Sequence, residues 1–164
     1  MDMSSLLFES FNSEENSSDP VIEMLVKALA SELLAASKYW YCMQASKGKG
    51  KSDADPEFKL HYDEEMLHAT TLAKRINELG GNIPSGPSEW MQKWEFTPVE
   101  GANVRNMLES NIADEKGAIE FYGSIVDMTV NSDSTTYDVA KLHKAKEEEH
   151  LHDLELLLQE LDDN

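Results

Sequence analysis

Apolar residues recur at helical spacing along four stretches of this chain, and turn-forming residues separate the stretches. On a helix, residues three, four and seven positions apart share one face. Each of the four stretches has one such apolar face, and none shows the alternation typical of strands. We therefore expect helices at about 20–48, 56–79, 98–130 and 136–161.

Capping signals mark the start of the first three predicted helices. Asp19 before Pro20 and Asp55 before Pro56 are typical of an N-cap followed by a first-turn proline. Residues 97–100 contain a threonine and, three positions later, a glutamate, which is the pattern of a capping box.

The connection between the second and third helices is much longer than the other two. Residues 83–97 contain Pro84, Pro87 and three large aromatic side chains, which predicts an irregular segment with room for one short helix. An extended chain spans about 3.3 Å per residue, so this segment can run the roughly 40 Å length of one helix. The second and third helices can then be parallel. The predicted fold is all-α, an antiparallel four-helix bundle with one long crossover.

Ionisable residues interrupt the apolar faces, and the interruption repeats between the two halves of the chain. The first and third helices each carry one glutamate and, seven residues later, a tyrosine. The second and fourth helices each carry a Glu-x-x-His pair. The set is Glu32, Tyr39, Glu65 and His68 in the first half, and Glu115, Tyr122, Glu147 and His150 in the second. Coincidence would have to produce this pattern twice.

The fourth helix has two possible core faces. One contains Ala140, Glu147, His150, Leu154, Leu157 and Leu161. The other contains Leu142, Ala145, Glu149, His152, Leu156 and Gln159, and it becomes polar at its C-terminal end. The first is the better core face, so Glu147 and His150 are predicted to point inward. Glu148, Glu149, His152, His61 and His143 are then expected to face solvent or to lie next to the inward-facing groups.

Four carboxylates in a leucine-rich core are costly, and two imidazoles cannot neutralise them. Two divalent cations can, each with a terminal glutamate and histidine and with two further glutamates as bridges. The predicted ligands are Glu32, Glu65, His68, Glu115, Glu147 and His150. This oxygen-rich set favours iron or manganese over a structural zinc ion. One Glu-x-x-His pair on an acidic helix is usually a solvated face, but two pairs on core faces favour a metal site. Tyr39 and Tyr122 are expected beside the ligands, as core aromatics.

Composition narrows the partners and the compartment. The chain has 32 acidic and 14 basic residues and a net charge of −18, which disfavours direct binding to nucleic acid and attracts cations. A single cysteine, Cys42, excludes an internal disulfide or an all-cysteine metal site. No stretch approaches the roughly 18 apolar residues of a membrane span, and no basic leader is evident. We expect a cytoplasmic protein, with a flexible tail at 1–18 and one domain at 19–164.

The sequence resembles the ferritin superfamily, in particular bacterioferritins and Dps-like proteins that have a bacterioferritin-type site. The resemblance covers about residues 20–161. It rests on the two Glu-x-x-His pairs, on RINELGGNIP after the second helix, and on DMT, TYDVA and EEEH in the second half. It implies the six ligands predicted above, a hollow homo-oligomer, and oxidation of Fe(II) by dioxygen or hydrogen peroxide with storage of ferric mineral.

Three departures from the relatives limit what the resemblance implies. Dps-like proteins commonly carry a cysteine pair on the third helix, where this chain has Gly117 and Val126. Rubrerythrins carry a further glutamate where Ala118 stands, and this chain has no rubredoxin cysteines. Only 14 residues follow His150, so the short fifth helix of 24-subunit ferritins is not expected and a dodecamer is favoured.

Met66 occupies the position of the haem-ligating methionine of bacterioferritins, so haem is a further implied cofactor, although methionine at such a surface usually serves packing alone. The sequence thus predicts a ferroxidase in an iron-storage cage that also protects against peroxide. Two alternatives stay open. One is a di-iron or di-manganese oxidase or peroxidase that stores nothing, and the other is an acidic helical scaffold that binds no metal.

Overall fold

The computed structural model describes residues 19–163, and the predicted tail at 1–18 lies outside this range. The helices in the described range are α1 (Pro20–Ala45), α2 (Lys51–Glu78), α3 (Pro87–Lys93), α4 (Val104–Thr129) and α5 (Ser134–Asp163). None of these helices is both long enough and apolar enough to cross a membrane.

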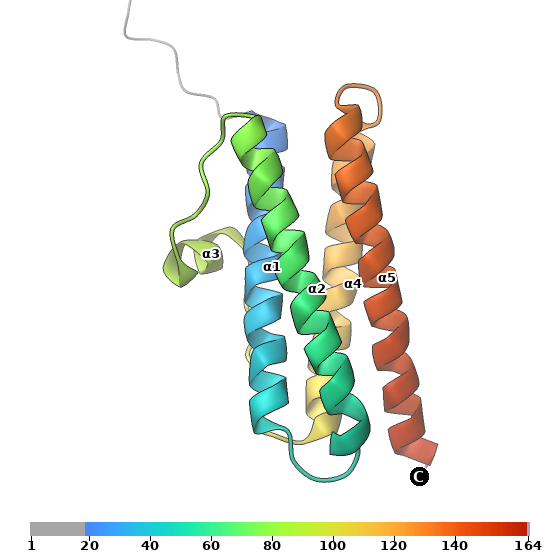
Figure 1. The fold of residues 1–164 in the computed structure, drawn as a ribbon. Helices are drawn as coiled ribbons and strands as arrows, with labels where there is room; N and C mark the ends of the chain where they lie inside the picture. Colours follow the sequence, from blue (N-terminus) through green and yellow to red (C-terminus); the bar gives the residue numbers. More distant parts are fainter. Residues whose placement is uncertain (1–18, 164) are drawn as a thin grey trace, which may run out of the picture.

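Two antiparallel hairpins, α1 with α2 and α4 with α5, pack side by side to form a bundle of four long helices (Figure 1). The connection from α2 to α4 runs back along the bundle beside α1 and contains α3 (Figure 1). As a result, α2 and α4 run in the same direction. The predicted four-helix bundle, its long crossover and the short helix within the crossover are confirmed.

The α2 helix begins at Lys51 and not at Pro56. Gly50, with a φ angle of 82°, leads the chain into the helix. The Asp55 carboxylate accepts hydrogen bonds from Ser46 Oγ and Lys51 Nζ, each at 2.5 Å. The predicted cap at Asp55 is therefore wrong, because this side chain holds the turn between α1 and α2, and the proline is accommodated within the helix.

The α4 helix begins at Val104, so the predicted capping box at 97–100 is also wrong. Asn103 is the N-cap, and its side chain accepts a hydrogen bond from the Asn106 N–H at 2.9 Å. The Lys47 N–H donates to the Ala102 carbonyl at 2.9 Å, and Lys47 forms an isolated bridge with Asn103, so the residues just before α4 are held against the α1–α2 turn. A tertiary contact therefore outweighs the local capping signal.

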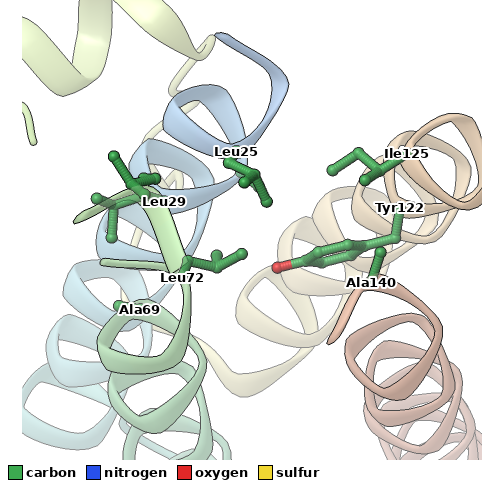
Figure 2. Packing of buried hydrophobic residues seen from close by; sticks show 9 residues of the cluster. Leu25, Leu29, Ala69, Leu72, Tyr122, Ile125 and Ala140 are labelled. Carbon is green, nitrogen blue, oxygen red and sulfur yellow. The ribbon is translucent and has the colours of Figure 1, made fainter. Parts of the chain in front are cut away.

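Two apolar clusters fill the bundle on either side of its middle. In the first, Leu25, Leu29 and Leu72 of the α1–α2 hairpin face Tyr122 and Ile125 of α4 (Figure 2). The second lies toward the α1–α2 turn, and its large members are Tyr39, Phe58, Met107, Leu108 and Leu154. The layer between the two clusters consists of acidic and histidine side chains.

Burial along α5 follows the first of the two predicted registers. Ala140, Glu147, His150 and Leu154 are buried. On the other face, Leu142 is 61% exposed, and Glu149, His152 and Leu156 are also exposed.

A buried lysine fastens the crossover to the middle of the bundle. Lys38 of α1 is 2% exposed, forms an ion pair with Asp114 of α4 and lies 3.1 Å from Ser110 Oγ. Its ammonium group also lies 5.6 Å from the centre of the Phe96 ring. Trp94 packs edge-on against Phe121 at a centroid distance of 4.9 Å. These contacts place the end of the crossover beside the acidic layer.

Candidate metal centre

The acidic layer brings together all six predicted ligand residues. Single glutamates come from α1 and α4, and a Glu-x-x-His pair comes from each of α2 and α5, because an i, i+3 spacing puts both side chains on the inner face of a helix. None is more than 4% exposed. They are Glu32, Glu65, His68, Glu115, Glu147 and His150.

The ligating atoms fall into two overlapping groups, and within each group all atoms lie within 4.8 Å of one another. Glu32 and His68 belong to the first group only, and Glu115 and His150 to the second only. Glu65 and Glu147 belong to both. This arrangement suits two cations that share a pair of carboxylates.

Several atoms at the centre of this layer lack any hydrogen-bond partner. They are Glu65 Oε2, both carboxylate oxygens of Glu147, and the Nδ1 atoms of His68 and His150. His68 Nδ1 lies 3.0 Å from Glu147 Oε1 and 3.3 Å from Glu65 Oε2, without the direction of a hydrogen bond. Buried polar atoms that converge on a point without bonding one another match the donor set of a metal site. The residues therefore fit a pair of divalent cations.

The electrostatics of the layer show how unfavourable it is without cations. Burial, followed by the charges of Glu147 and Glu32, raises the pKa of Glu65 well above its usual value. Burial also raises the pKa of Glu115 to about 7. Burial opposes a charge on His68, but the carboxylates of Glu147, Glu32 and Glu65 outweigh it and raise its pKa to about 12. The layer therefore retains protons that a cation would displace.

Two tyrosines form hydrogen bonds across the bundle to Glu32 and Glu115, the terminal glutamates that each belong to one metal position only. The Tyr39 hydroxyl donates to Glu115, and the Tyr122 hydroxyl donates to Glu32. Each hydroxyl is also close to a histidine: His61 Nδ1 is 3.1 Å from the Tyr39 oxygen, and His143 Nδ1 is 3.2 Å from that of Tyr122. Both halves of the bundle thus contain the same chain of histidine, tyrosine and glutamate.

His61 and His143 are buried and lie next to the predicted ligands. The sequence left two positions open for them, facing solvent or beside the inward-facing groups, and the structure shows the second. The His61 ring stacks on His150 at 4.0 Å, and the His143 ring stacks on His68 at 4.4 Å. The sequence contains a signal for this arrangement. Each histidine stands four residues before a Glu-x-x-His glutamate, so both share its helix face.

Glu64 also contacts the acidic layer, and the sequence pattern did not reveal this contact. Its carboxylate lies 2.7 Å from His150 Nε2 and so accepts a hydrogen bond from this nitrogen, which leaves Nδ1 directed at the centre. A carboxylate in this role fixes the ring and its tautomer and strengthens a histidine ligand. The equivalent position before Glu147 is Lys146, so only one half of the centre has this support.

Replacement of Glu64 by glutamine is expected to weaken one of the two metal positions and spare the other. Loss of such an orienting partner costs about 10–100-fold in metal affinity. Anaerobic titration with Co(II) should therefore show a weaker affinity at the Glu115 and His150 position of E64Q than in the parent, with the affinity at the Glu32 and His68 position unchanged. The exposed neighbour Asp63, replaced by asparagine, serves as the control and should leave both affinities unchanged. A parent-like affinity at the Glu115 and His150 position of E64Q would contradict this role.

Comparison with known proteins identifies the family. The model of the ferritin-like domain matches residues 22–163. The chain belongs to the ferritin-like family. The resemblance inferred from the sequence motifs is thereby confirmed.

Relatives within the ferritin-like family include Dps-type proteins and bacterioferritins. A DNA protection during starvation protein from Pyrococcus furiosus is 28% identical over 80% of this chain and 73% of its own length. A bacterioferritin from Rhodobacter capsulatus is 33% identical over 62% of this chain, which spans only 59% of that protein. A solved structure, described as a dodecameric thioferritin and bacterioferritin-related protein from Bacteroides fragilis, has a TM-score of 0.84. It is 33% identical and matches over 87% of this chain and 86% of its own.

A narrow cavity leads toward the ferritin-like centre from the side of the crossover. Its volume is about 20 Å³, enough for a water-sized molecule. Trp94 and Phe96 line it on the crossover side, and Glu32, Glu65 and Glu115 line it on the inner side. The cavity therefore leaves room for one water-sized molecule beside three of the predicted ligands.

Proposed function

We propose that the chain is a ferroxidase subunit that takes two Fe(II) ions as substrate between its four long helices and stores the oxidised iron in a cytoplasmic homo-oligomeric cage. One ion is assigned to Glu32 and His68, the other to Glu115 and His150, and Glu65 and Glu147 are shared. The main observation that supports this proposal is that buried ligand atoms of these residues converge without hydrogen-bond partners. Manganese fits the same oxygen-rich donor set.

The stoichiometry of the proposed centre matches the proposed oxidants. Two Fe(II) ions release two electrons, which with two protons reduce one hydrogen peroxide to two waters or one dioxygen to one hydrogen peroxide. The shared carboxylates would hold the ions close enough to act on one molecule of oxidant. The four carboxylates balance the four positive charges of the ions, and the apolar clusters on either side exclude bulk water.

The chain's own protons must leave for the ions to bind. His68 and His150 bind a cation only through unprotonated Nδ1 atoms, whereas in the metal-free layer their pKa values are raised by the neighbouring carboxylates. Glu64 keeps the other His150 nitrogen occupied, and the two tyrosines keep one oxygen of each terminal glutamate occupied. These bonds orient the remaining lone pairs toward the substrate ions.

No thiol takes part in the proposed reaction. The positions expected for a cysteine pair hold Gly117 and Val126, and burial raises the pKa of Cys42 to about 11. The thiol is therefore protonated and enclosed, which makes it a poor nucleophile and metal ligand.

The proposed cage is a dodecamer. It is supported by the description of the Bacteroides fragilis relative as dodecameric. Large apolar side chains also stand on the outside of the single chain, including Trp40 at 55%, Leu67 at 64% and Leu142 at 61% exposure. Burial of these side chains between subunits would remove apolar surface from water. With a net charge of −18, any protection of DNA is proposed to act by removing Fe(II) and peroxide and not by direct binding.

Two measurements test the proposal. Addition of Fe(II) in air, or of hydrogen peroxide after anaerobic loading, should produce ferric absorbance faster than buffer alone, and the particle mass should be that of a dodecamer. Oxidation by a dimer would instead support the oxidase or peroxidase that stores nothing. A protein that purifies and titrates without iron or manganese would support the acidic scaffold.

Haem at Met66 is a separate prediction. Met66 is 38% exposed on the outer face of α2, beside the more exposed Leu67, so a haem there would need a second subunit to cover it. Protein produced in a haem-replete host should then show a Soret band that M66L lacks. A parent protein with no Soret band would exclude haem.

A further inference from the structure

A second cluster of ligating groups lies beside the metal centre, on the far side of the His150 ring. It consists of Glu57 and His61, one turn apart on α2, and Asp153 on α5. The helices α2 and α5 are neighbours in the bundle (Figure 1). His61 Nε2 lies 3.7 Å from Glu57 Oε2 and 4.0 Å from Asp153 Oδ2. His61 is fully buried, whereas the two carboxylates are 33% and 42% exposed.

The hydrogen bonds around His61 define which of its nitrogens carries the proton. The Tyr39 hydroxyl donates its only proton to Glu115, so its oxygen accepts from His61 Nδ1–H at 3.1 Å. The ring is fully buried and its Nε2 makes no hydrogen bond to either neighbouring carboxylate, which is the arrangement expected of a neutral ring. A neutral imidazole has one N–H, and Nε2 is therefore left with a lone pair.

Three acceptors then face one another with no donor between them. His61 Nε2 and Glu57 Oε2 are both buried atoms without a hydrogen-bond partner. A lone pair directed at two carboxylates is repulsive in a site of low polarity, and it costs more than an ordinary unpaired group. A cation between them would turn this repulsion into three favourable contacts.

We propose that Glu57, His61 and Asp153 form a third divalent-cation site, separate from the two positions of the central layer. Ligand atoms bound to one cation at about 2.1 Å lie roughly 3.0–3.4 Å apart, so the two carboxylates need to shorten their 3.7 and 4.0 Å separations from His61 Nε2 by about 0.3–1.0 Å. Their partial exposure permits this movement and leaves room for water ligands. One nitrogen and two carboxylate oxygens suit Fe(II), Mn(II), Co(II) or Zn(II).

The site occurs in only one of the two similar halves. His143 occupies the place of His61 in the second half and contacts Tyr122 in the same way. The residues that match Glu57 and Asp153 in spacing are Val139 and Thr71, neither of which is a carboxylate. The extra cation would therefore sit next to the Glu115 and His150 position alone. A role as a transfer station for Fe(II) on its way to that position rests on the proposed function, whereas cation binding itself does not.

Anaerobic Co(II) titration of the full-length protein tests the site, because Co(II) is redox-stable and its visible spectrum reports its ligands. The parent should bind about three equivalents per chain and E57Q/D153N about two. The control D63N/E155Q removes the same charge from exposed positions on the same two helices and should keep all three. Retention of the two central ions shows that the double variant is folded. Two equivalents in the parent, or three in E57Q/D153N, would overturn the proposal.

Anomalous scattering from a Co(II)-soaked crystal separates this proposal from the proposed function. A peak within bonding distance of His61 Nε2 supports the third site even where the central layer is empty, and that outcome would refute the ferroxidase. Peaks in the central layer with none at His61 would refute the third site and leave the ferroxidase standing.

Discussion

A variant in which Glu65 and Glu147 are both replaced by glutamine is expected to oxidise Fe(II) no faster than buffer. These are the two carboxylates common to both metal positions. Each metal position therefore loses two negative charges and two carboxylate oxygen donors. Loss of a residue that only orients a ligand costs about 10–100-fold in affinity, so the rate should fall by about 100-fold or more. Ferric absorbance after addition of Fe(II) in air, and of hydrogen peroxide after anaerobic loading, measures the loss.

The same variant should be more stable than the parent when metal is absent. Burial and the like charges of Glu147 and Glu32 raise the pKa of Glu65, so its charge is unfavourable in the metal-free protein. Replacement of buried ionic groups by well-packed neutral residues of similar volume is often neutral or stabilises a protein by about 1–4 kcal/mol. Thermal unfolding in the presence of a chelator measures this gain. Lost activity together with raised stability cannot result from misfolding.

A matched control stands on the same helix as one of the two residues. Glu148 and Glu149 are exposed and adjacent to Glu147. E148Q/E149Q removes the same charge and should retain the parent rate. A parent-like rate in E65Q/E147Q would instead show that Fe(II) is oxidised elsewhere in the molecule.

Helical periodicity was sufficient to predict the bundle and the inner face of each long helix. A charged residue stays on a core face only if something compensates it, so a glutamate among leucines is an informative departure from the pattern. The buried positions of Glu147 and His150, as opposed to Glu149 and His152, follow from this reasoning. The assignment of these side chains as metal ligands stays a prediction until ions are located.

The features that the sequence did not reveal depend on contacts between different helices. Glu64 is half-buried and next to a ligand in sequence, and only the position of α5 shows that it contacts His150. The start of α4 is fixed by the backbone bond from Lys47 to Ala102, between segments far apart in the chain. Periodicity within one helix contains no information about such partners, whereas it does contain the spacing of His61 and His143.

Binding of divalent metal is expected to raise the melting temperature by about 10–20 °C. A ligand present at one hundred times its dissociation constant stabilises the native state by about 2.7 kcal/mol, so two ions contribute roughly 5 kcal/mol. In a chain of this size, 1 kcal/mol corresponds to about 2–4 °C. Thermal unfolding with excess Co(II) and with chelator gives the difference. E65Q/E147Q is the control, and its melting temperature should rise with Co(II) only by the smaller contribution of the site at Glu57, His61 and Asp153.

The size of this metal effect is expected to grow as the pH rises from 6.5 to 8. The folded-state pKa of Glu115 is raised to about 7, so the stability linked to its proton is complete below its unfolded pKa near 4.5 and is lost as the pH passes about 7. For His68, the corresponding loss begins near pH 6.5 and continues toward its folded pKa of about 12. Glu115 alone should cost the metal-free protein about 1 kcal/mol over this interval.

The metal-loaded protein should escape this loss, because its ligands are already deprotonated and the cations replace the displaced protons. The buried histidines do not reverse the trend. Burial lowers the pKa values of His61 and His143 to about 3. These two residues therefore destabilise the folded protein only as the pH falls below 6.5, and they have no such effect above it. Melting temperatures that fell equally with and without Co(II) between pH 6.5 and 8 would show that the protons of the acidic layer and the metal ions do not compete for the same atoms.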